Sequence, residues 1–109
     1  MGPFAVGDVV TILFPFADLS ALKARPAVIV GIADLNNVIV CQITSNAAAS
    51  KKALVLGSTD FREGELRLIS YIRPDKIFTL DTKLIRQSVG KLSSQKIVEM
   101  RQALAAILT

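Results

Sequence analysis

Several polar residues of this sequence stand where predicted strands begin or end, and side chains at such positions can face a ligand. Arg25 immediately precedes Pro26, at the start of an apolar run that spans residues 27–32. The proline restricts the backbone before it to extended conformations, so the guanidinium of Arg25 has a preset direction. Thr44 and Ser45 follow another apolar run, where their hydroxyl groups could face a ligand or close a turn. Taken alone, an ordinary surface arginine and a capped turn are the simpler interpretations.

A second polar pair flanks a proline further along the chain. Arg73 and Asp75 lie on either side of Pro74, at the end of a predicted strand. Residues two apart in a strand point to the same side, so the two side chains could meet. A salt bridge of this kind at the surface stabilises a fold by only ~0–1 kcal/mol. On these residues alone, a surface ion pair is the simplest account.

The missing residue types limit the chemistry. The sequence has no histidine and one cysteine, Cys41. This excludes Ser-His-Asp and Cys-His nucleophilic sites, intramolecular disulfides, and zinc sites built from histidine or several cysteines. The acidic residues are scattered without metal-ligand spacing, and no glycine-rich phosphate loop is present. We therefore expect no metal and no other cofactor, and an enzyme built on this chain must use Arg, Lys, Asp, Glu and hydroxyl groups.

Length and charge set the class of molecule. The chain has 109 residues, which suits a single domain over residues 1–109, and a formal net charge of +4. The basic residues concentrate between residues 67 and 101, and a basic surface favours nucleic acid or acidic proteins, although it could equally serve solubility alone. No apolar run approaches the ~20 residues of a membrane helix, and residues 1–7 do not resemble a secretory signal. We expect a cytoplasmic protein without membrane association.

Apolar periodicity predicts short strands followed by one helix. Strands are expected at residues 9–14, 27–32, 38–44, 52–56, 66–73, 77–80 and 89–92. Residues 34–37 carry turn chemistry that should form a hairpin, residues 57–64 are turn-like, and residues 82–87 could form one helical turn. Pro74 should end a strand or lie at an edge. Ser93 is a suitable N-cap for the single long helix. The expected fold class is α+β, mostly β, with a small closed barrel and a helix laid on it.

Together these positions carry a family resemblance. Five stretches match in chain order: residues 7–10 (GDVV), 25–30 (RPAVIV), 40–45 (VCQITS), 71–81 (YIRPDKIFTLD) and 89–93 (VGKLS), the last just before the final helix. Each stretch is weak alone, but five in order over nearly the whole chain make a specific pattern. By these motifs the sequence resembles the MazF/PemK family of toxins from bacterial type II toxin–antitoxin pairs.

The resemblance implies a fold, an activity and partners. The fold would be an SH3-like small barrel (MazF/PemK/CcdB-like) with a C-terminal helix, forming a homodimer. The activity would be metal-independent, sequence-specific cleavage of single-stranded RNA, usually messenger RNA, which leaves 2′,3′-cyclic phosphate and 5′-hydroxyl ends. The partner would be a cognate antitoxin protein whose acidic, partly disordered tail covers the RNA groove.

The resemblance also implies roles for individual residues. Family members contact the scissile phosphate through the arginine of the Arg-Pro pair and the threonine of the Ile-Thr-Ser stretch, which are Arg25 and Thr44 here. The Arg-x-Asp pair that some members use corresponds to Arg73 and Asp75. These four residues are the expected catalytic group. The expected RNA-binding residues are Lys23, Ser45, Lys76 and Thr79.

Proton transfer is the least determined part of the expected mechanism. Some family members place a histidine in the loop before the Arg-Pro pair, and this chain has none there. Lys23, Asp18 or Ser20 could take its place, or this function could be absent. Asp75 is the candidate general base on condition that its pKa is raised, although the neighbouring Arg73 would lower it. Because an arginine is a reluctant proton donor, Arg73 suits charge stabilisation better than acid catalysis.

Two other functions stay open. A CcdB-like toxin on the same barrel inhibits DNA gyrase and cleaves nothing, but that branch typically ends in a helix that contains tryptophan, and this chain has none. A non-catalytic RNA-binding barrel would use Arg25 and the basic second half of the chain only to hold phosphates. A gyrase supercoiling assay separates the first from a ribonuclease, and RNA binding without cleavage would favour the second.

Overall fold

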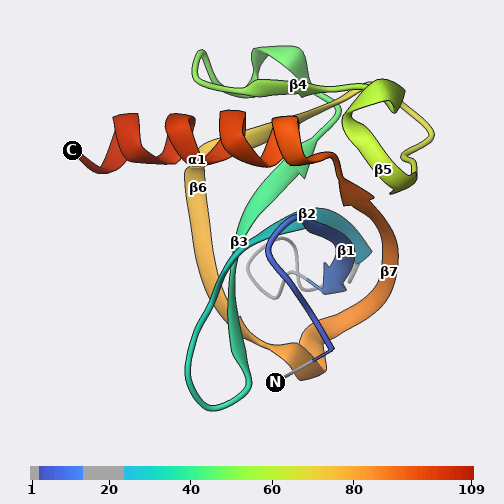
Figure 1. Cartoon of the computed structure of the whole chain (residues 1–109), viewed down its shortest axis with the longest axis vertical. Coiled ribbons are helices and arrows are strands. Elements are labelled where there is room, and N and C mark those ends of the chain that lie inside the picture. Colours follow the sequence, from blue (N-terminus) through green and yellow to red (C-terminus); the bar gives the residue numbers. More distant parts are fainter. Residues whose placement is uncertain (1–2, 14–23) are drawn as a thin grey trace, which may run out of the picture.

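A computed structural model describes residues 3–13 and 24–109, which form seven strands and one α-helix (Figure 1). The strands are β1 (Asp8–Leu13), β2 (Ala24–Ile32), β3 (Asn37–Thr44), β4 (Leu54–Leu56), β5 (Phe61–Gly64), β6 (Ser70–Asp81) and β7 (Ile85–Leu92). The helix α1 spans Ser94–Leu108, and short 3₁₀ turns lie at Ala47–Ala49, Ser58–Asp60 and Thr82–Leu84. The mostly β, α+β class is thereby confirmed. None of the helices in these residues is long and apolar enough to cross a membrane.

One antiparallel sheet contains all seven of these strands. Its strand order is β4-β6-β3-β2-β1-β7-β5, and it curls so that β6 and β7 flank the central strands on opposite sides (Figure 1). In the described part of the chain, β4 and β5 are the two edges of the sheet. The strand predicted at residues 52–56 is therefore confirmed in β4, whereas the expected closed barrel is instead, in the described residues, a curled sheet with two edges.

Apolar side chains fill both faces of this sheet. On β1, Val9 and Val10 are both fully buried, but they belong to separate apolar clusters. On β2, Val28 joins the first cluster, while its neighbours Ala27 and Ile29 join the second. Because side chains alternate between the two faces of a strand, a strand covered on both faces requires the continuous apolar run that the sequence shows.

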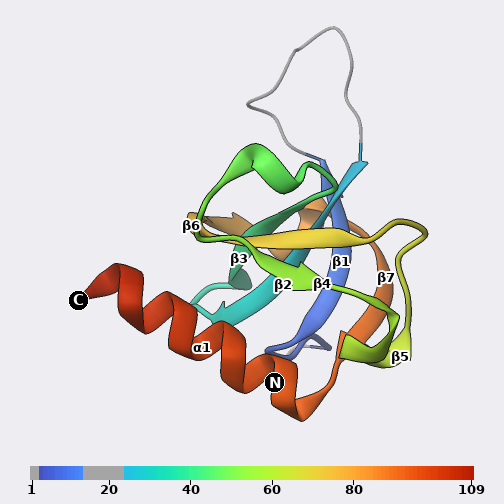
Figure 2. The ribbon, with the colours of Figure 1, turned by 90° about the horizontal axis from the view of Figure 1, so that it is seen from above.

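The C-terminal helix covers one of these faces (Figure 2). The side chain of Ser93 accepts a hydrogen bond from Lys96 N at 3.2 Å and caps α1, as predicted. Met100 is fully buried in the cluster that contains Val9. Beyond it, the end of α1 projects past the sheet, and Leu108 is exposed (Figure 2).

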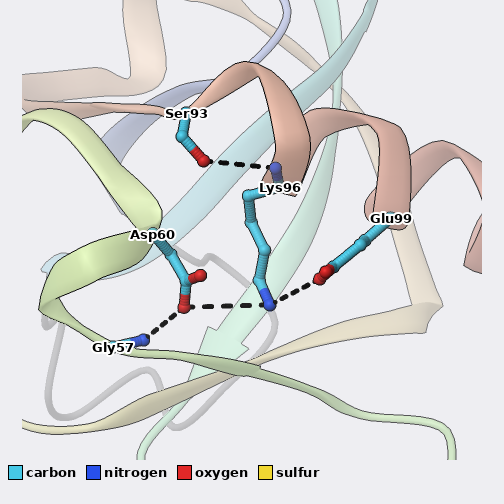
Figure 3. Close-up of polar contacts among 5 residues, drawn as sticks. All are labelled: Gly57, Asp60, Ser93, Lys96 and Glu99. Atoms are coloured by element: carbon cyan, nitrogen blue, oxygen red, sulfur yellow. Dashed lines mark hydrogen bonds and ion pairs between the residues drawn. The ribbon is translucent and has the colours of Figure 1, made fainter.

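A buried lysine ties the helix to the turn before β5 (Figure 3). The side chain of Lys96 is only 5% exposed, and its Nζ lies 2.9 Å from Glu99 Oε2 and 3.8 Å from Asp60 Oδ2. Asp60 Oδ2 also accepts a hydrogen bond from Gly57 N at 2.8 Å. A buried ammonium group needs partners of this kind, because burying an unpaired charge is costly. The network therefore stabilises the contact between α1 and the turn at residues 57–60.

The predicted hairpin at residues 34–37 joins β2 to β3. Leu35 and Asn36 have positive φ angles of 58° and 63°. Two successive residues in this conformation make a type I′ turn, whose twist suits a two-residue hairpin connection. Asparagine adopts it readily and leucine only at a cost, so the paired strands on both sides must hold Leu35 in place.

The prediction that Pro74 ends a strand or lies at an edge is wrong. Pro74 is fully buried inside β6, which continues to Asp81. The pairing of β6 with β3 shifts at this point, so that residues 73–76 of β6 face the single residue Gln42 of β3. A bulge interrupts the ladder locally, and a proline, which lacks an N–H donor, is tolerated there.

The segment around β5 also departs from the prediction. Residues 61–64, expected as a turn, form strand β5, while residues 66–69 lie outside any strand and β7 begins at Ile85. The backbones of β5 and β7 approach closely, because a Cβ atom at Gly90 would lie 2.7 Å from Glu63 O. Gly90 permits this approach because it has no side chain. The residues of β5 show no alternation of apolar and polar types, so the apolar pattern of the sequence did not indicate this strand.

Candidate functional site

A pocket opens where β2 begins and β3 ends, and we call it the β2–β3 pocket. Its volume is about 360 Å³. Its lining residues, in chain order, are Arg25, Pro26, Gln42, Ile43, Thr44, Ser45, Leu66, Arg67, Leu68 and Ser70. Three residues that the sequence singled out, Arg25, Thr44 and Ser45, are thus brought together in space.

The antiparallel register of β2 and β3 explains why Arg25 and Thr44 line the same pocket. Ala27 of β2 pairs with Gln42 of β3. Arg25 lies two residues before Ala27, and Thr44 lies two residues after Gln42, which is the same end of the antiparallel ladder. Residues two apart in a strand point to the same face, so Arg25 and Thr44 lie on the face of the sheet that Ala27 and Gln42 occupy. On the other side, Arg25 pairs with Ile12 of β1. The backbone of Arg25 is therefore held against β1 while its side chain is exposed.

The loop after β3 orients the hydroxyl of Thr44. Thr44 Oγ1 accepts a hydrogen bond from Asn46 N at 3.1 Å. Asn46 Oδ1 in turn accepts one from Ala48 N at 3.0 Å and caps the 3₁₀ turn at Ala47–Ala49. The backbone N–H occupies only a lone pair of the Thr44 oxygen, so the hydroxyl proton is left to donate to a ligand.

A second guanidinium reaches the pocket from Arg67, for which the sequence pattern indicated no site role. Arg67 is exposed in the segment of residues 65–69 between β5 and β6, which also contributes the apolar Leu66 and Leu68 to the lining. Ser70 Oγ donates a hydrogen bond to Leu68 O at 3.0 Å and fixes the end of this segment. The only sequence signal for Arg67 was the basic stretch that begins with it.

Arg73 and Asp75 form an ion pair with each other, outside the pocket lining. Arg73 Nη2 lies 3.1 Å from Asp75 Oδ2, in the bulge of β6. This hydrogen bond lowers the pKa of the Asp75 carboxyl from its ordinary value and outweighs burial, which acts to raise it. The raised pKa required for Asp75 as a general base is therefore absent while Arg73 holds it. The pair belongs to the same part of the sheet as the pocket, because Tyr71 of β6 pairs with Thr44.

Two of the other predicted RNA-binding residues, Lys76 and Thr79, are not among the lining residues of the pocket. Lys76 is exposed in the bulge of β6, and Thr79 is exposed further along the same strand. Lys23, with Asp18 and Ser20, falls outside the described residues. The roles of these residues stay predictions.

The single cysteine has no role in this site. Cys41 is buried, and burial is the main cause that raises the pKa of its thiol to about 12. A thiol that stays protonated is a poor nucleophile. Within residues 3–13 and 24–109, no group of three or more His, Cys, Asp and Glu side chains could hold a metal ion.

The described residues form a curled antiparallel sheet with a C-terminal helix, and a basic pocket lies at one end of the central strands β2 and β3. This combination can be compared with known protein families. The family described as "PemK-like, MazF-like toxin of type II toxin-antitoxin system" matches residues 5–108, and the chain belongs to this family. The resemblance seen in the five sequence stretches is thereby confirmed. None of the curated protein sequences matches the chain significantly.

Several solved structures share the fold. An endoribonuclease from a mycobacterial species aligns with a TM-score of 0.74 at 21% identity, over 99% of this chain and 93% of that chain. An endoribonuclease in complex with its cognate antitoxin, also mycobacterial, gives a TM-score of 0.73 at 21% identity, over 99% and 95%. MazF from Deinococcus radiodurans gives 0.73 at 21% identity, over 94% of both chains.

Proposed function

We propose that this protein is an endoribonuclease toxin that cuts single-stranded RNA in the β2–β3 pocket without a metal ion. The observation that carries the proposal is that Arg25 and Thr44 line one pocket in a chain of the PemK/MazF family. The endoribonucleases of the same fold support this activity. A guanidinium can bind a phosphate through two parallel hydrogen bonds, and Arg67 adds a second cation to the same pocket.

RNA carries its own nucleophile, so this cleavage needs no metal-bound water. The 2′-oxygen attacks the adjacent phosphorus, the bond from phosphorus to the 5′-oxygen breaks, and the products end in a 2′,3′-cyclic phosphate and a 5′-hydroxyl. The 2′-hydroxyl loses one proton and the leaving 5′-oxygen gains one. Negative charge develops on the non-bridging oxygens in between, and there Arg25 and the hydroxyl of Thr44 would stabilise it.

The ion pair of Arg73 and Asp75 supplies a route for the first proton. In the free protein, the hydrogen bond from Arg73 keeps the Asp75 carboxylate ionised and weakly basic, because it lowers the Asp75 pKa. An RNA phosphate that draws Arg73 away would remove this hydrogen bond. The pKa of Asp75 would then rise, which makes the carboxylate a better acceptor for the 2′-hydroxyl proton. Binding of RNA would thus activate the base.

A homodimer and an acidic antitoxin are the partners that we propose. A related endoribonuclease has been solved with its cognate antitoxin. The net charge of +4 suits two competing polyanions, an RNA and an acidic protein tail. Exposed apolar side chains on β4 and on the segment before β6, namely Val55, Leu68 and Ile69, offer contact surface to a protein partner.

The experiment is RNA digestion by the purified protein in excess EDTA, followed by analysis of the ends of the fragments. We expect cleavage to persist and to leave 2′,3′-cyclic phosphate and 5′-hydroxyl ends. Loss of cutting in EDTA, or 3′-hydroxyl ends, would contradict the mechanism. RNA binding without cleavage would favour a non-catalytic barrel, and inhibition of gyrase supercoiling would favour a CcdB-like toxin.

A further inference from the structure

Gln42 carries an unusual polar atom. Its side-chain oxygen Oε1 is buried and has no hydrogen-bond partner. No other buried side-chain nitrogen or oxygen in the described residues lacks one. Buried polar groups are nearly always paired, because an unpaired one gives up its bonds to water without replacement. An exception in a native fold calls for a reason beyond stability, and a ligand that supplies the missing donor is one.

The position of Gln42 connects this oxygen with the proposed cleavage site. Gln42 lines the β2–β3 pocket together with Arg25 and Thr44. Its backbone is fixed by pairing with Ala27, and it faces the bulge of β6 at residues 73–76. The terminal torsion of a glutamine side chain is soft, so rotation of the amide can bring the carbonyl oxygen to the pocket.

The chemistry of the pocket defines what would meet this oxygen. A carbonyl oxygen only accepts hydrogen bonds, so it repels a phosphate and requires an N–H or O–H donor. Pro26, Ile43, Leu66 and Leu68 provide apolar walls on the same pocket. A flat group with apolar faces and a donor on its edge fits this combination. An unstacked nucleobase is such a group, because proteins recognise single-stranded RNA by enclosing the faces of splayed bases and bonding to their edges.

We propose that Gln42 is a specificity-determining residue, whose Oε1 accepts a hydrogen bond from the exocyclic amino group of a base held in the β2–β3 pocket. The inference rests on the proposed ribonuclease function and names the part of the substrate that this site selects. Adenine, cytosine and guanine carry such an amino group, and uracil does not. The donor that uracil offers on this edge is its ring N3–H, which lies between two carbonyl oxygens that repel another carbonyl oxygen. The protein therefore disfavours uracil at one position beside the cut.

The first experiment maps cleavage sites in a pool of random single-stranded RNA. The wild-type protein is expected to cut with a preference of about tenfold or more for amino-bearing bases over uracil at one position beside the cut. Gln42→Met and Gln42→Leu, which keep the volume but lack the acceptor, should reduce that preference to less than about threefold. Gln102→Met, at an exposed position of α1, is the matched control and should keep it.

The second experiment removes the amino group from the RNA instead. At the preferred position, the base is replaced by its counterpart without the amine, such as purine for adenine or hypoxanthine for guanine. Cleavage by the wild-type protein should slow about tenfold or more, and cleavage by Gln42→Met by less than about threefold. If Gln42 had only a structural role, removal of the amino group would slow cleavage equally in the wild type and in Gln42→Met.

The outcomes separate this inference from the proposed function. Wild-type protein that cuts RNA without regard to the amino group, or Gln42 variants that keep the full preference, would overturn the role of Gln42 and leave the ribonuclease intact. Wild-type protein that cuts no RNA would overturn both. Because Oε1 has no partner to lose, the melting temperature of Gln42→Met should equal or exceed that of the wild type. If Gln42→Met fails to fold, Gln42→Leu takes its place in both experiments.

Discussion

Arg73 Nη2 lies 3.1 Å from Asp75 Oδ2, and the two residues flank the buried Pro74 in a bulge of β6. The proline fixes the backbone between the two side chains, and both of them remain partly exposed, at 21% and 34%. The ion pair therefore forms because the backbone places the two side chains close together, and not because the protein interior encloses them. An RNA phosphate could compete for Arg73 without unfolding any part of the sheet.

Removal of the Arg73 guanidinium should raise the pKa of Asp75. The hydrogen bond from Arg73 is the largest cause that lowers this pKa, so in Arg73→Ala it should return toward the ordinary value. The measurement is an NMR titration of the Asp75 carboxyl carbon in both proteins. Lys76→Ala, which removes an exposed neighbouring cation, is the control and should shift the Asp75 midpoint less. An unchanged midpoint in Arg73→Ala would show that the pair does not persist in solution.

The hydroxyl of Thr44 should matter for catalysis more than for stability. Thr44→Val keeps the shape of the side chain but loses the proton that would stabilise the phosphate, so we expect about 100-fold slower single-turnover cleavage. Its stability should fall by only about 1 kcal/mol, because the bond from Asn46 N is lost at an exposed site. Thr44→Ser keeps the hydroxyl and should stay within about tenfold of the wild-type rate. Equal rates for wild type and Thr44→Val would remove Thr44 from the site.

Arg67 should act on RNA affinity through charge. If it binds one phosphate, Arg67→Ala weakens binding to a non-cleavable RNA with a 2′-deoxy nucleotide at the cut. The slope of log affinity against log salt should also fall by about 0.7. Fluorescence anisotropy at several salt concentrations measures both. Arg86→Ala removes an exposed arginine of β7 that is not among the pocket residues, and should change neither quantity. Identical salt slopes for Arg67→Ala and wild type would contradict the contact.

Lys96 should support the fold and not the site. Lys96→Met keeps the apolar stem but removes the ion pairs to Glu99 and Asp60, whose carboxylates are 44% and 25% exposed and can return to water. We expect the free energy of unfolding to fall by about 1 kcal/mol in urea titrations, because both ion pairs are lost but their carboxylates regain water, with cleavage by the folded protein unchanged. Lys83→Met, at an exposed position, should leave stability nearly unchanged. A stable Lys96→Met protein would show that the network in Figure 3 is dispensable.

The central strands and the helix could be predicted from the sequence because their signals are local. The continuous apolar run at residues 27–32 indicated β2, the strand-like run at residues 38–44 indicated β3, and Ser93 indicated the N-cap of α1. The edge elements could not be predicted in the same way. β5 depends on a close backbone contact at Gly90, and the bulge of β6 depends on how its register meets β3. Neither property is a pattern of side-chain polarity along the chain.

The site shows the same division. The grouping of Arg25 and Thr44 at one pocket could be predicted because the family motifs mark both residues and a simple antiparallel register puts them on one face of the sheet. Arg67 and Gln42 could not, since an exposed arginine in a loop and a glutamine in an apolar strand have no distinguishing local pattern. What distinguishes them is a pocket formed by segments far apart in the sequence, and for Gln42 an oxygen without a partner.

The rate of cleavage by Arg25→Ala tests the central claim most directly. The measurement is single-turnover cleavage of one RNA in excess EDTA by wild type, Arg25→Ala and Arg101→Ala, the last an exposed arginine of α1. We expect Arg25→Ala to cut about 100-fold or more slowly, because it loses the charge that stabilises the phosphate, and Arg101→Ala to cut at the wild-type rate. Folding of each variant is checked by its urea midpoint. A folded Arg25→Ala protein that cuts RNA as fast as the wild type would contradict the assignment of the β2–β3 pocket as the site of cleavage.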